Sequence, residues 1–148
     1  MEFEKLIESP IGLLTLVSDG ESLTAIRFGD TTRELCSCPV LVQSAQELAE
    51  YFAGERRVFT VPLNARGTEF QRAVWAALCE IGYGETASYA QIATRIGNPK
   101  ACRAVGSANH CNPIPIMIPC HRVIGKNGAM TGYAGGISIK EFLLNLER

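Results

Sequence analysis

The sequence predicts two joined modules: an α/β N-terminal domain with a small antiparallel sheet, over 1–63, and a mainly α, winged helix-turn-helix C-terminal domain, over 66–148. Strand-like runs separated by turn residues occur in the first half, and helix-start signals occur in the second. The charges divide in the same way, because residues 1–60 carry five Lys or Arg against ten Asp or Glu, whereas 61–148 carry nine against five. Such asymmetry indicates two modules, the second of which tolerates a polyanion.

The composition predicts a folded chain with a hydrophobic core. Hydrophobic residues make up 47% of the 148 positions and charged residues 20%, which excludes global disorder. No apolar run approaches the roughly 20 residues that a membrane span requires, and the acidic N-terminus is unlike a secretory signal. We therefore expect a cytoplasmic protein, nucleoid-associated in a prokaryote or nuclear in a eukaryote. Its six cysteines are then expected to be free thiols.

The first predicted element is a β-hairpin. Apolar-rich runs at 13–17 and 23–28 flank the turn-rich cluster at 18–21. Because turn residues separate two β-prone runs of similar length, the runs are expected to pair as antiparallel strands.

A helix and a further strand are predicted after this hairpin. Beyond a polar loop at 29–39, the pattern favours a helix over 44–52, with Gly54 as its stop. The stretch 57–63 is expected to be a short strand. Residues 64–67 resemble a boundary between the two modules.

Four helices are predicted in the second half, at 68–81, 88–96, 98–109 and 138–147. The first, second and fourth open on the S/T-x-x-E/Q capping box, in which the hydroxyl accepts from the third backbone N–H while the acid or amide reaches back. The third opens on Asn98 followed by proline, a favourable pair for the N-cap and first helical position. In the last of these boxes, the Glu141 side chain is expected to hydrogen-bond back to the N-cap residue.

The second and third of these helices form a helix-turn-helix pattern, since only Gly97 separates them. Within the third helix, i, i+3, i+4, i+7 spacing predicts an inward face made of Ala101, Ala104, Val105 and Ala108. Arg103 lies off this face and is expected to point outward. Gly106 and the alanines leave a shallow surface that a partner backbone can approach. An ordinary helical hairpin in a small core remains the alternative.

A hairpin-like wing is predicted near the C-terminal end. Residues 125–128 contain Asn-Gly, a strong turn signal because this pair readily adopts positive φ. The short apolar pairs 123–124 and 129–130 flank the turn and could form two short strands. The C-terminal module would then carry a wing in addition to its helices.

The strongest chemical signal is the pair Cys120-His121, which follows the β-prone apolar run 114–118. A thiol is a strong nucleophile only as the thiolate, and a nearby imidazole can take its proton. Either His121 or His110 could be that base. The candidates for a group that orients the base are Asn112, Glu141 and Glu147.

Other interpretations of these residues stay open. Cys120 can be a buried structural cysteine. A zinc site could use His110, Cys111, Cys120 and His121, although two adjacent pairs make an awkward ligand set. Cys36 and Cys38 could bind a metal or oxidise. The small-residue loop at 132–136 could hold a phosphate at the start of the next helix or form a wall against a flat ligand.

These segments together resemble one family, the O6-alkylguanine-DNA alkyltransferases, also called methylated-DNA–protein-cysteine methyltransferases. The matching motifs are Tyr83-Gly84-Glu85-Thr86, Ser88-Tyr89, Gly97-Asn98-Pro99-Lys100, Arg103-Ala104-Val105-Gly106, Asn112-Pro113, Ile118-Pro119-Cys120-His121-Arg122-Val123-Ile124-Gly125 and Thr131-Gly132-Tyr133-Ala134-Gly135-Gly136. The resemblance covers 66–148 closely. The N-terminal part matches loosely, through Ser9-Pro10-Ile11-Gly12-Leu13 and Tyr51-Phe52.

The resemblance implies DNA repair by irreversible, single-turnover transfer of an alkyl group from O6-alkylguanine, and also from O4-alkylthymine, to Cys120. His121 would deprotonate Cys120 through water. Glu147 would orient His121, and Asn112 would brace the site. Tyr133, Ala134 and Gly135 would line the alkyl pocket.

The resemblance also implies base flipping in double-stranded DNA. Arg103 would enter the duplex and fill the gap left by the extruded base, and Tyr89 would rotate the nucleotide and hydrogen-bond the flipped guanine. Ala104, Gly106 and Ser107 would lie against the DNA beside them. The helix-turn-helix would meet the minor groove, and the protein would act as a monomer.

Two features of this chain qualify the resemblance. The zinc ligands of some relatives' N-terminal domains have no clear counterparts, so we expect neither a metal nor another cofactor. Glu147 is the penultimate residue, and fraying of the last turn would remove the partner of His121.

Two other functions remain as alternatives. The first is an alkyltransferase-like protein that recognises damage without transfer, and the presence of Cys120 argues against it. A Cys-His hydrolase or transferase acting on small molecules is more distant, since it would leave Arg103 and the helix-turn-helix pattern unexplained.

Overall fold

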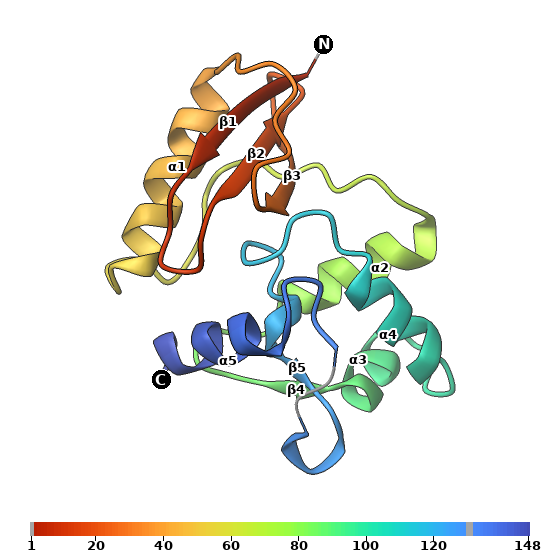
Figure 1. The fold of residues 1–148 in the computed structure, drawn as a ribbon. Helices are drawn as coiled ribbons and strands as arrows, with labels where there is room; N and C mark the ends of the chain where they lie inside the picture. Colours follow the sequence, from red (N-terminus) through yellow and green to blue (C-terminus); the bar gives the residue numbers. More distant parts are fainter. Residues whose placement is uncertain (1, 130–131) are drawn as a thin grey trace. The chain divides into compact units, whose positions relative to one another are not determined.

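The computed structural model describes residues 2–129 and 132–148. Contacts between Cα atoms divide the chain into two compact units, Met1–Arg66 and Gly67–Arg148 (Figure 1). Each unit is described by itself.

The N-terminal unit is a three-stranded antiparallel sheet with one helix against it. The strands β1 (Phe3–Ile7), β2 (Leu14–Ser18) and β3 (Leu23–Phe28) pair in chain order. Helix α1 (Pro39–Phe52) contacts all three strands, and Figure 1 shows it lying along the sheet. Every residue of the central strand is buried, so β2 lies in the core of this unit together with the helix packed on the sheet. This arrangement confirms the predicted α/β class and the predicted hairpin.

Several N-terminal elements differ from the prediction. The strand β1 was not expected, because its sequence FEKLI has two adjacent charged residues in its middle and lacks the period-two alternation of a half-buried strand. Only Glu4 of the five residues is buried. Helix α1 begins at Pro39 and not at residue 44, since proline is favourable in the first turn.

The prediction of a strand at 57–63 is also wrong. In this stretch only Leu63 makes a β-bridge, to Leu23. The Glu47 carboxylate takes the place of a strand partner, accepting hydrogen bonds from Thr60 N at 2.8 Å, Thr60 Oγ1 at 2.6 Å and Val61 N at 3.3 Å.

The C-terminal unit is mainly helical, as predicted. Its helices are α2 (Glu69–Leu78), α3 (Tyr89–Arg95), α4 (Cys102–His110) and α5 (Ile137–Leu146). The helices α2, α3 and α4 pack against one another (Figure 1), and Trp75 Nε1 of α2 donates to Ala108 O of α4 at 2.8 Å. Trp75 is therefore a core residue that joins two helices.

The first two capping boxes are confirmed, and the third is wrong. At Thr68 and Ser88 the reciprocal side-chain and backbone hydrogen bonds are both present. Helix α5 begins at Ile137, after Gly136 with φ of 99°, and no side chain caps it. Ser138 therefore lies inside the helix, and Glu141 is exposed.

The start of α4 also differs from the prediction. The helix begins at Cys102, because Asn98 to Ala101 form a separate turn in which Ala101 N donates to Asn98 O at 3.0 Å. Of its predicted inward face, Val105 and Ala108 are buried, but Ala104 is exposed and Ala101 is half-buried. The buried face instead continues to Asn109. Starting the helix four residues later places the α3–α4 turn over 96–101.

The expected wing has a different structure. The strand β5 (Val123–Ile124) pairs in parallel with β4 (Ala87–Ser88), so its partner is not the segment after the turn. Lys126–Gly128 form a one-turn 3₁₀ helix, and Gly125 N donates to Ala129 O at 2.7 Å. Met130, part of the expected second strand, lies outside the described residues.

No helix in the described part of the chain is long and apolar enough to cross a membrane.

Candidate functional site

Cys120 follows a buried, irregular segment and not the β-strand that its apolar composition suggested. Residues 113–118 form bends and turns, and Ile116 has φ of 76°. A β-branched residue rarely adopts this left-handed conformation, so the surrounding packing must hold it there. Asn112 braces the segment, since its Nδ2 donates to Ile118 O at 2.8 Å and its Oδ1 accepts from Ile114 N at 3.0 Å. Asn112 therefore joins the two ends of the segment that precedes Cys120.

The Cys120 thiol is protonated at neutral pH in this environment. Cys120 opens a 3₁₀ turn, Cys120–Arg122, and is 3% exposed. Burial raises the pKa of the thiol to about 11, although hydrogen bonding to Asn112, the charge of Lys140 and hydrogen bonding to Tyr133 act in the opposite direction. Formation of the thiolate therefore needs a base.

His121 follows Cys120 in the sequence and is fully buried. Its two ring nitrogens have different surroundings. Nε2 lies 2.7 Å from Glu147 Oε2. Nδ1 is buried and forms no hydrogen bond within the described structure. Burial lowers the pKa of His121, and the Glu147 carboxylate offsets part of this effect. A lowered pKa keeps the imidazole neutral, which is the state that can accept a proton.

Of the three candidates for a group that orients His121, Glu147 is the one whose side chain contacts the imidazole. Its side chain is 1% exposed and accepts from Arg122 Nε at 2.8 Å and from Arg122 Nη2 at 3.0 Å, in addition to the contact with His121. Gly84 N donates to Oε1 at 3.4 Å. These contacts hold the last turn in place, so the fraying expected for a penultimate residue is not what the structure contains. The other candidate, Glu141, is exposed.

Two buried cations in the site were missed by the sequence analysis. Lys140 is fully buried in α5, and its Nζ donates to Val123 O at 2.5 Å. Its position could have been recognised, because residues 140, 143, 144 and 147 share one face of that helix at i, i+3, i+4, i+7 spacing. Arg122 carries no such signal, since its partners are 25 and 41 residues away.

The predicted alkyl-pocket residues lie between the 3₁₀ turn at 126–128 and α5. Tyr133 is buried, and it lowers the pKa of the Cys120 thiol, so the two residues are neighbours. Ala134 is exposed and Gly135 is half-buried.

The predicted DNA-binding residues gather on the outer face of the helix-turn-helix. Arg103, Ala104 and Ser107 are exposed on α4. Tyr89, the first residue of α3, lies against Gly106, where an added Cβ would be 3.8 Å from Tyr89 Cε1. Tyr89 and Gly106 are therefore neighbours across the contact between α3 and α4.

The described structure gives no support to the zinc alternative. His110 and Cys111 are exposed at the end of α4, whereas Cys120 and His121 are buried. Within residues 2–129 and 132–148, no three His, Cys, Asp or Glu side chains gather closely enough to hold a metal ion.

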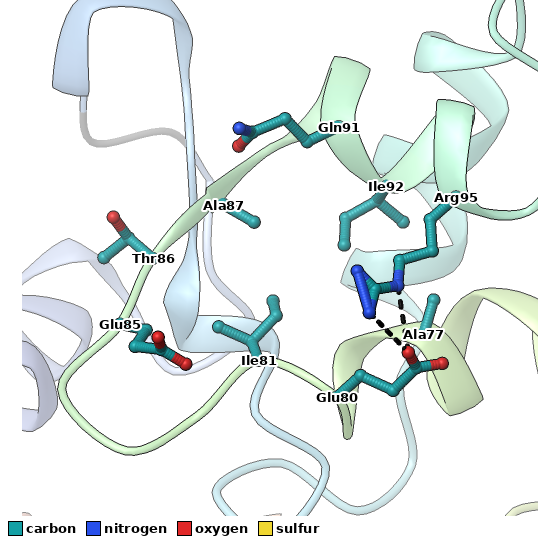
Figure 2. Close-up of a pocket in the computed structure, with 9 residues that line it drawn as sticks. All are labelled: Ala77, Glu80, Ile81, Glu85, Thr86, Ala87, Gln91, Ile92 and Arg95. Carbon is teal, nitrogen blue, oxygen red and sulfur yellow. Dashed lines mark hydrogen bonds and ion pairs between the residues drawn. The ribbon is translucent and has the colours of Figure 1, made fainter.

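A surface pocket of about 240 Å³ lies on the C-terminal unit, away from the predicted site residues (Figure 2). Ile81 and Ile92 form part of its apolar wall. Arg95 Nη2 lies 2.7 Å from Glu80 Oε2 at its edge, and both side chains are largely exposed. None of the predicted catalytic or DNA-binding residues lines this pocket.

Both halves of the chain match known sequence families. Residues 69–148 match the "6-O-methylguanine DNA methyltransferase, DNA binding domain", and residues 3–65 match the "6-O-methylguanine DNA methyltransferase, ribonuclease-like domain".

Individual proteins similar to the chain carry related names. The Methylated-DNA--protein-cysteine methyltransferase of Methanosarcina acetivorans is 51% identical, over 96% of each chain. The constitutive enzyme of that name from Bacillus subtilis is 47% identical, over 100% of this chain and 96% of its own. The fold is similar to that of Mycobacterium tuberculosis O6-methylguanine methyltransferase, with a TM-score of 0.91 and 49% identity over 99% of this chain and 93% of the other.

A DNA complex is among the similar structures. The crystal structure of Mycobacterium tuberculosis OGT in complex with DNA has a TM-score of 0.91 and 50% identity, over 98% of this chain and 92% of the other. Because the two family matches together span nearly the whole sequence, the chain belongs to the 6-O-methylguanine DNA methyltransferase family.

Proposed function

We propose that this protein repairs double-stranded DNA by transferring the alkyl group of O6-alkylguanine to Cys120, once per molecule. The observation that carries the proposal is the buried Cys120-His121 pair, with His121 Nε2 held 2.7 Å from a buried Glu147 carboxylate. The similar proteins from Methanosarcina acetivorans and Bacillus subtilis are named for transfer to a protein cysteine. A similar protein has been crystallised with DNA.

The protonation states of Cys120 and His121 before the reaction are those that the transfer requires. Burial raises the pKa of Cys120 to about 11 and lowers the pKa of His121, so the resting pair is a thiol beside a neutral imidazole. His121 takes the thiol proton, through a water molecule. The Cys120 sulfur then attacks the alkyl carbon, a carbon–sulfur bond forms, and the bond between that carbon and guanine O6 breaks. The departing electron pair and the proton go to guanine, which leaves neutral.

The product explains why each molecule reacts once. The alkylated cysteine is a thioether, which water does not readily hydrolyse, so the thiol is not regenerated. O4-alkylthymine offers the same kind of alkyl–oxygen bond and is a second substrate in this proposal. The reaction needs neither a metal nor another cofactor.

A base within the duplex stack cannot present its O6 substituent to a buried thiol, so the nucleotide must be flipped out. Flipping costs a few kcal/mol, and a side chain inserted into the vacated space offsets part of that cost. Arg103 is exposed on α4 and carries a planar cation suited to this role. Tyr89 rotates the nucleotide and hydrogen-bonds the flipped guanine.

The surface around Arg103 fits close approach to DNA. Ala104 and Ser107 are exposed and small, and Gly106 carries no side chain. The helix-turn-helix of α3 and α4 meets the minor groove, whose readout is degenerate. Sequence tolerance of this kind suits repair, because damage occurs in any sequence context.

Tyr133, Ala134 and Gly135 line the alkyl pocket in this proposal. The effect of Tyr133 on the pKa of the Cys120 thiol supports the placement. The protein acts in the cytoplasm as a monomer, associated with the nucleoid in a prokaryote and with nuclear DNA in a eukaryote.

The two halves are proposed as separate domains, 1–63 and 66–148. The family matches at 3–65 and 69–148 and the division of contacts after Arg66 support these boundaries.

Intact-protein mass spectrometry tests the proposal. The protein is incubated with duplex DNA containing O6-methylguanine, and the expected result is one added methyl group per molecule, mapped to Cys120. Unmodified duplex is the control. A protein that binds the damaged duplex but gains no mass would instead be the damage-recognition alternative. A methyl group mapped to another residue would remove Cys120 as the acceptor.

A further inference from the structure

Arg122 is buried beside His121, and the transfer chemistry proposed above assigns it no role. Its Nη1 donates to Ile81 O at 2.6 Å, while Nε and Nη2 donate to the two oxygens of Glu147 at 2.8 and 3.0 Å. We infer that Arg122 is a positioning residue that keeps Glu147 ionised and thereby fixes the His121 proton on Nε2, leaving Nδ1 as the base. This inference rests on the proposed function of the site.

The first step of the argument concerns the charge of Glu147. A guanidinium remains protonated at every pH at which proteins fold, and it donates through two N–H groups in a plane that matches a carboxylate. Glu147 also accepts from Gly84 N at 3.4 Å. A proton added to either oxygen would displace one of these donors and leave a buried cation with a neutral partner. Glu147 is therefore an acceptor only.

The second step fixes the tautomer of His121. Because Glu147 Oε2 is an acceptor, the Nε2 atom 2.7 Å away must carry a proton and donate it. Burial and the nearby charges of Arg122 and Lys140 lower the pKa of His121, so the ring holds a single proton near neutral pH. The lone pair is then on Nδ1, the buried atom that has no hydrogen bond within the described structure.

The third step shows that Arg122 joins three segments. It lies in the turn that carries Cys120, and its contacts reach the Ile81 carbonyl after α2 and the Glu147 side chain after α5. Tyr83 Oη donates to Leu146 O at 3.3 Å beside it. Gly84 lies close to the Glu147 backbone, since its φ is 78° and an added Cβ would lie 3.0 Å from Glu147 O. The orientation of His121 therefore depends on the segment after α2 that contains Ile81 and Gly84. In the hydrogen bonds described above, this segment contacts Arg122 and Glu147 but neither Cys120 nor His121.

The pH dependence of the reaction separates this role from ordinary packing. The Arg122 charge disfavours a further proton on the His121–Glu147 pair, so in Arg122→Met the pair should take up that proton at higher pH. A proton on either residue leaves Nδ1 of His121 unable to accept the thiol proton. The acid limb of the rate profile with free O6-benzylguanine should move upward by about 1 pH unit. Arg122→Lys keeps the charge but not the planar pair of donors, so its rate should fall while its acid limb stays near that of the unaltered protein. A contact that only aids packing would lower the rate at all pH values without moving the limb.

Arg95→Met is the matched control, because Arg95 forms an exposed ion pair with Glu80 in the same unit. It should change neither the rate with free O6-benzylguanine nor the acid limb. If the acid limb of Arg122→Met coincides with that of the unaltered protein, the inference is wrong. If Arg122→Met does not fold, the acid limb of Arg122→Lys is the deciding measurement. An upward shift of about 1 pH unit in Arg122→Lys, which retains the positive charge, would contradict the inference.

Nitrogen NMR of Cys120→Ser tests the tautomer without any alkyl transfer. The chain has two histidines, and His110→Gln assigns the second signal. A neutral His121 with its proton on Nε2 near pH 7 supports the inference, and a proton on Nδ1 or a charged ring overturns it. This measurement is independent of repair, so a protein that shows the expected tautomer but never accepts an alkyl group would refute the proposed function and not the assignment of Arg122.

Discussion

Glu147 Oε2 lies 2.7 Å from His121 Nε2, across 26 residues of sequence, and both side chains are buried. The carboxylate raises the pKa of His121, against the larger opposing effect of burial. The pKa of the His121 imidazole therefore depends in part on a residue that lies 26 positions away in the sequence.

Glu147→Gln should slow alkyl transfer by roughly tenfold or more, because loss of the carboxylate lowers the pKa of His121 further and weakens it as a base. Arg122 would also face a neutral partner, at a cost of about 3–5 kcal/mol for a broken buried pair. The measurements are the single-turnover rate on O6-methylguanine duplex and the urea midpoint. Glu141→Gln, an exposed change in α5, is the control. An unchanged rate would mean that the terminal carboxylate does not assist His121.

Cys120→Ala should abolish alkyl transfer while leaving the affinity for damaged duplex nearly unchanged. The thiol is buried, and the exposed surface of α4 that is proposed to meet DNA is not altered. Adduct mass and a binding titration measure the two properties separately. Cys111→Ala removes an exposed thiol and should behave as the unaltered protein does. Transfer that survives in Cys120→Ala would show that a different nucleophile acts.

Arg103→Ala should slow repair in duplex DNA by roughly 10- to 100-fold, as expected for the loss of an interaction worth about 1–3 kcal/mol. Its reaction with free O6-benzylguanine should not change, because no duplex has to be opened. Arg95→Ala removes an equal charge from α3 and controls for the general attraction to phosphates. Equal losses on duplex and free base would contradict an inserted role for Arg103.

The sequence predicts local structure well where the local chemistry is complete. The Thr68 and Ser88 caps were found because each box contains both of its hydrogen-bonding partners. Ser138 has the same pattern but lies inside α5, because the chain enters this helix through Gly136 with positive φ. The 57–63 stretch has strand-like composition, yet its backbone is paired largely by one buried carboxylate from α1. A pattern of neighbouring residues cannot reveal a partner that approaches from another element.

The same distinction applies to the site. Cys120 and His121 are adjacent, so a thiol–imidazole pair could be predicted from sequence. Glu147 is favoured over Glu141 by the family resemblance, and the structure places Glu147 at the imidazole. Arg122 was missed because its role depends on contacts with Ile81 and Glu147 that only the folded chain brings together.

Lys140→Met should make Cys120 less reactive. The buried lysine charge lowers the pKa of the thiol, so its removal should move that pKa above about 11 and reduce the thiolate fraction at every pH below it. The pH dependence of alkylation of Cys120 by iodoacetamide measures this shift directly. Lys126→Met, an exposed change, is the control. If the pH dependence of Lys140→Met matches that of the control, the lysine serves only to hold Val123 O.

Glu47→Gln should destabilise the N-terminal unit by about 1–3 kcal/mol at neutral pH, because a side-chain amide cannot accept through both ends from Thr60 and Val61. Hydrogen bonds from Thr60, Gln43 and Val61 outweigh burial and hold the pKa of Glu47 below its ordinary value of 4.5. A carboxylate with a lowered folded-state pKa contributes its stability above 4.5 and loses it as the pH falls through the folded-state value. Urea unfolding at pH 7 and in acid should therefore show a gap between the two proteins that narrows at low pH. Glu55→Gln, an exposed change just after α1, should show no gap at either pH. A gap of equal size in acid would mean that the loss comes from the shape of the amide and not from the charge of the carboxylate.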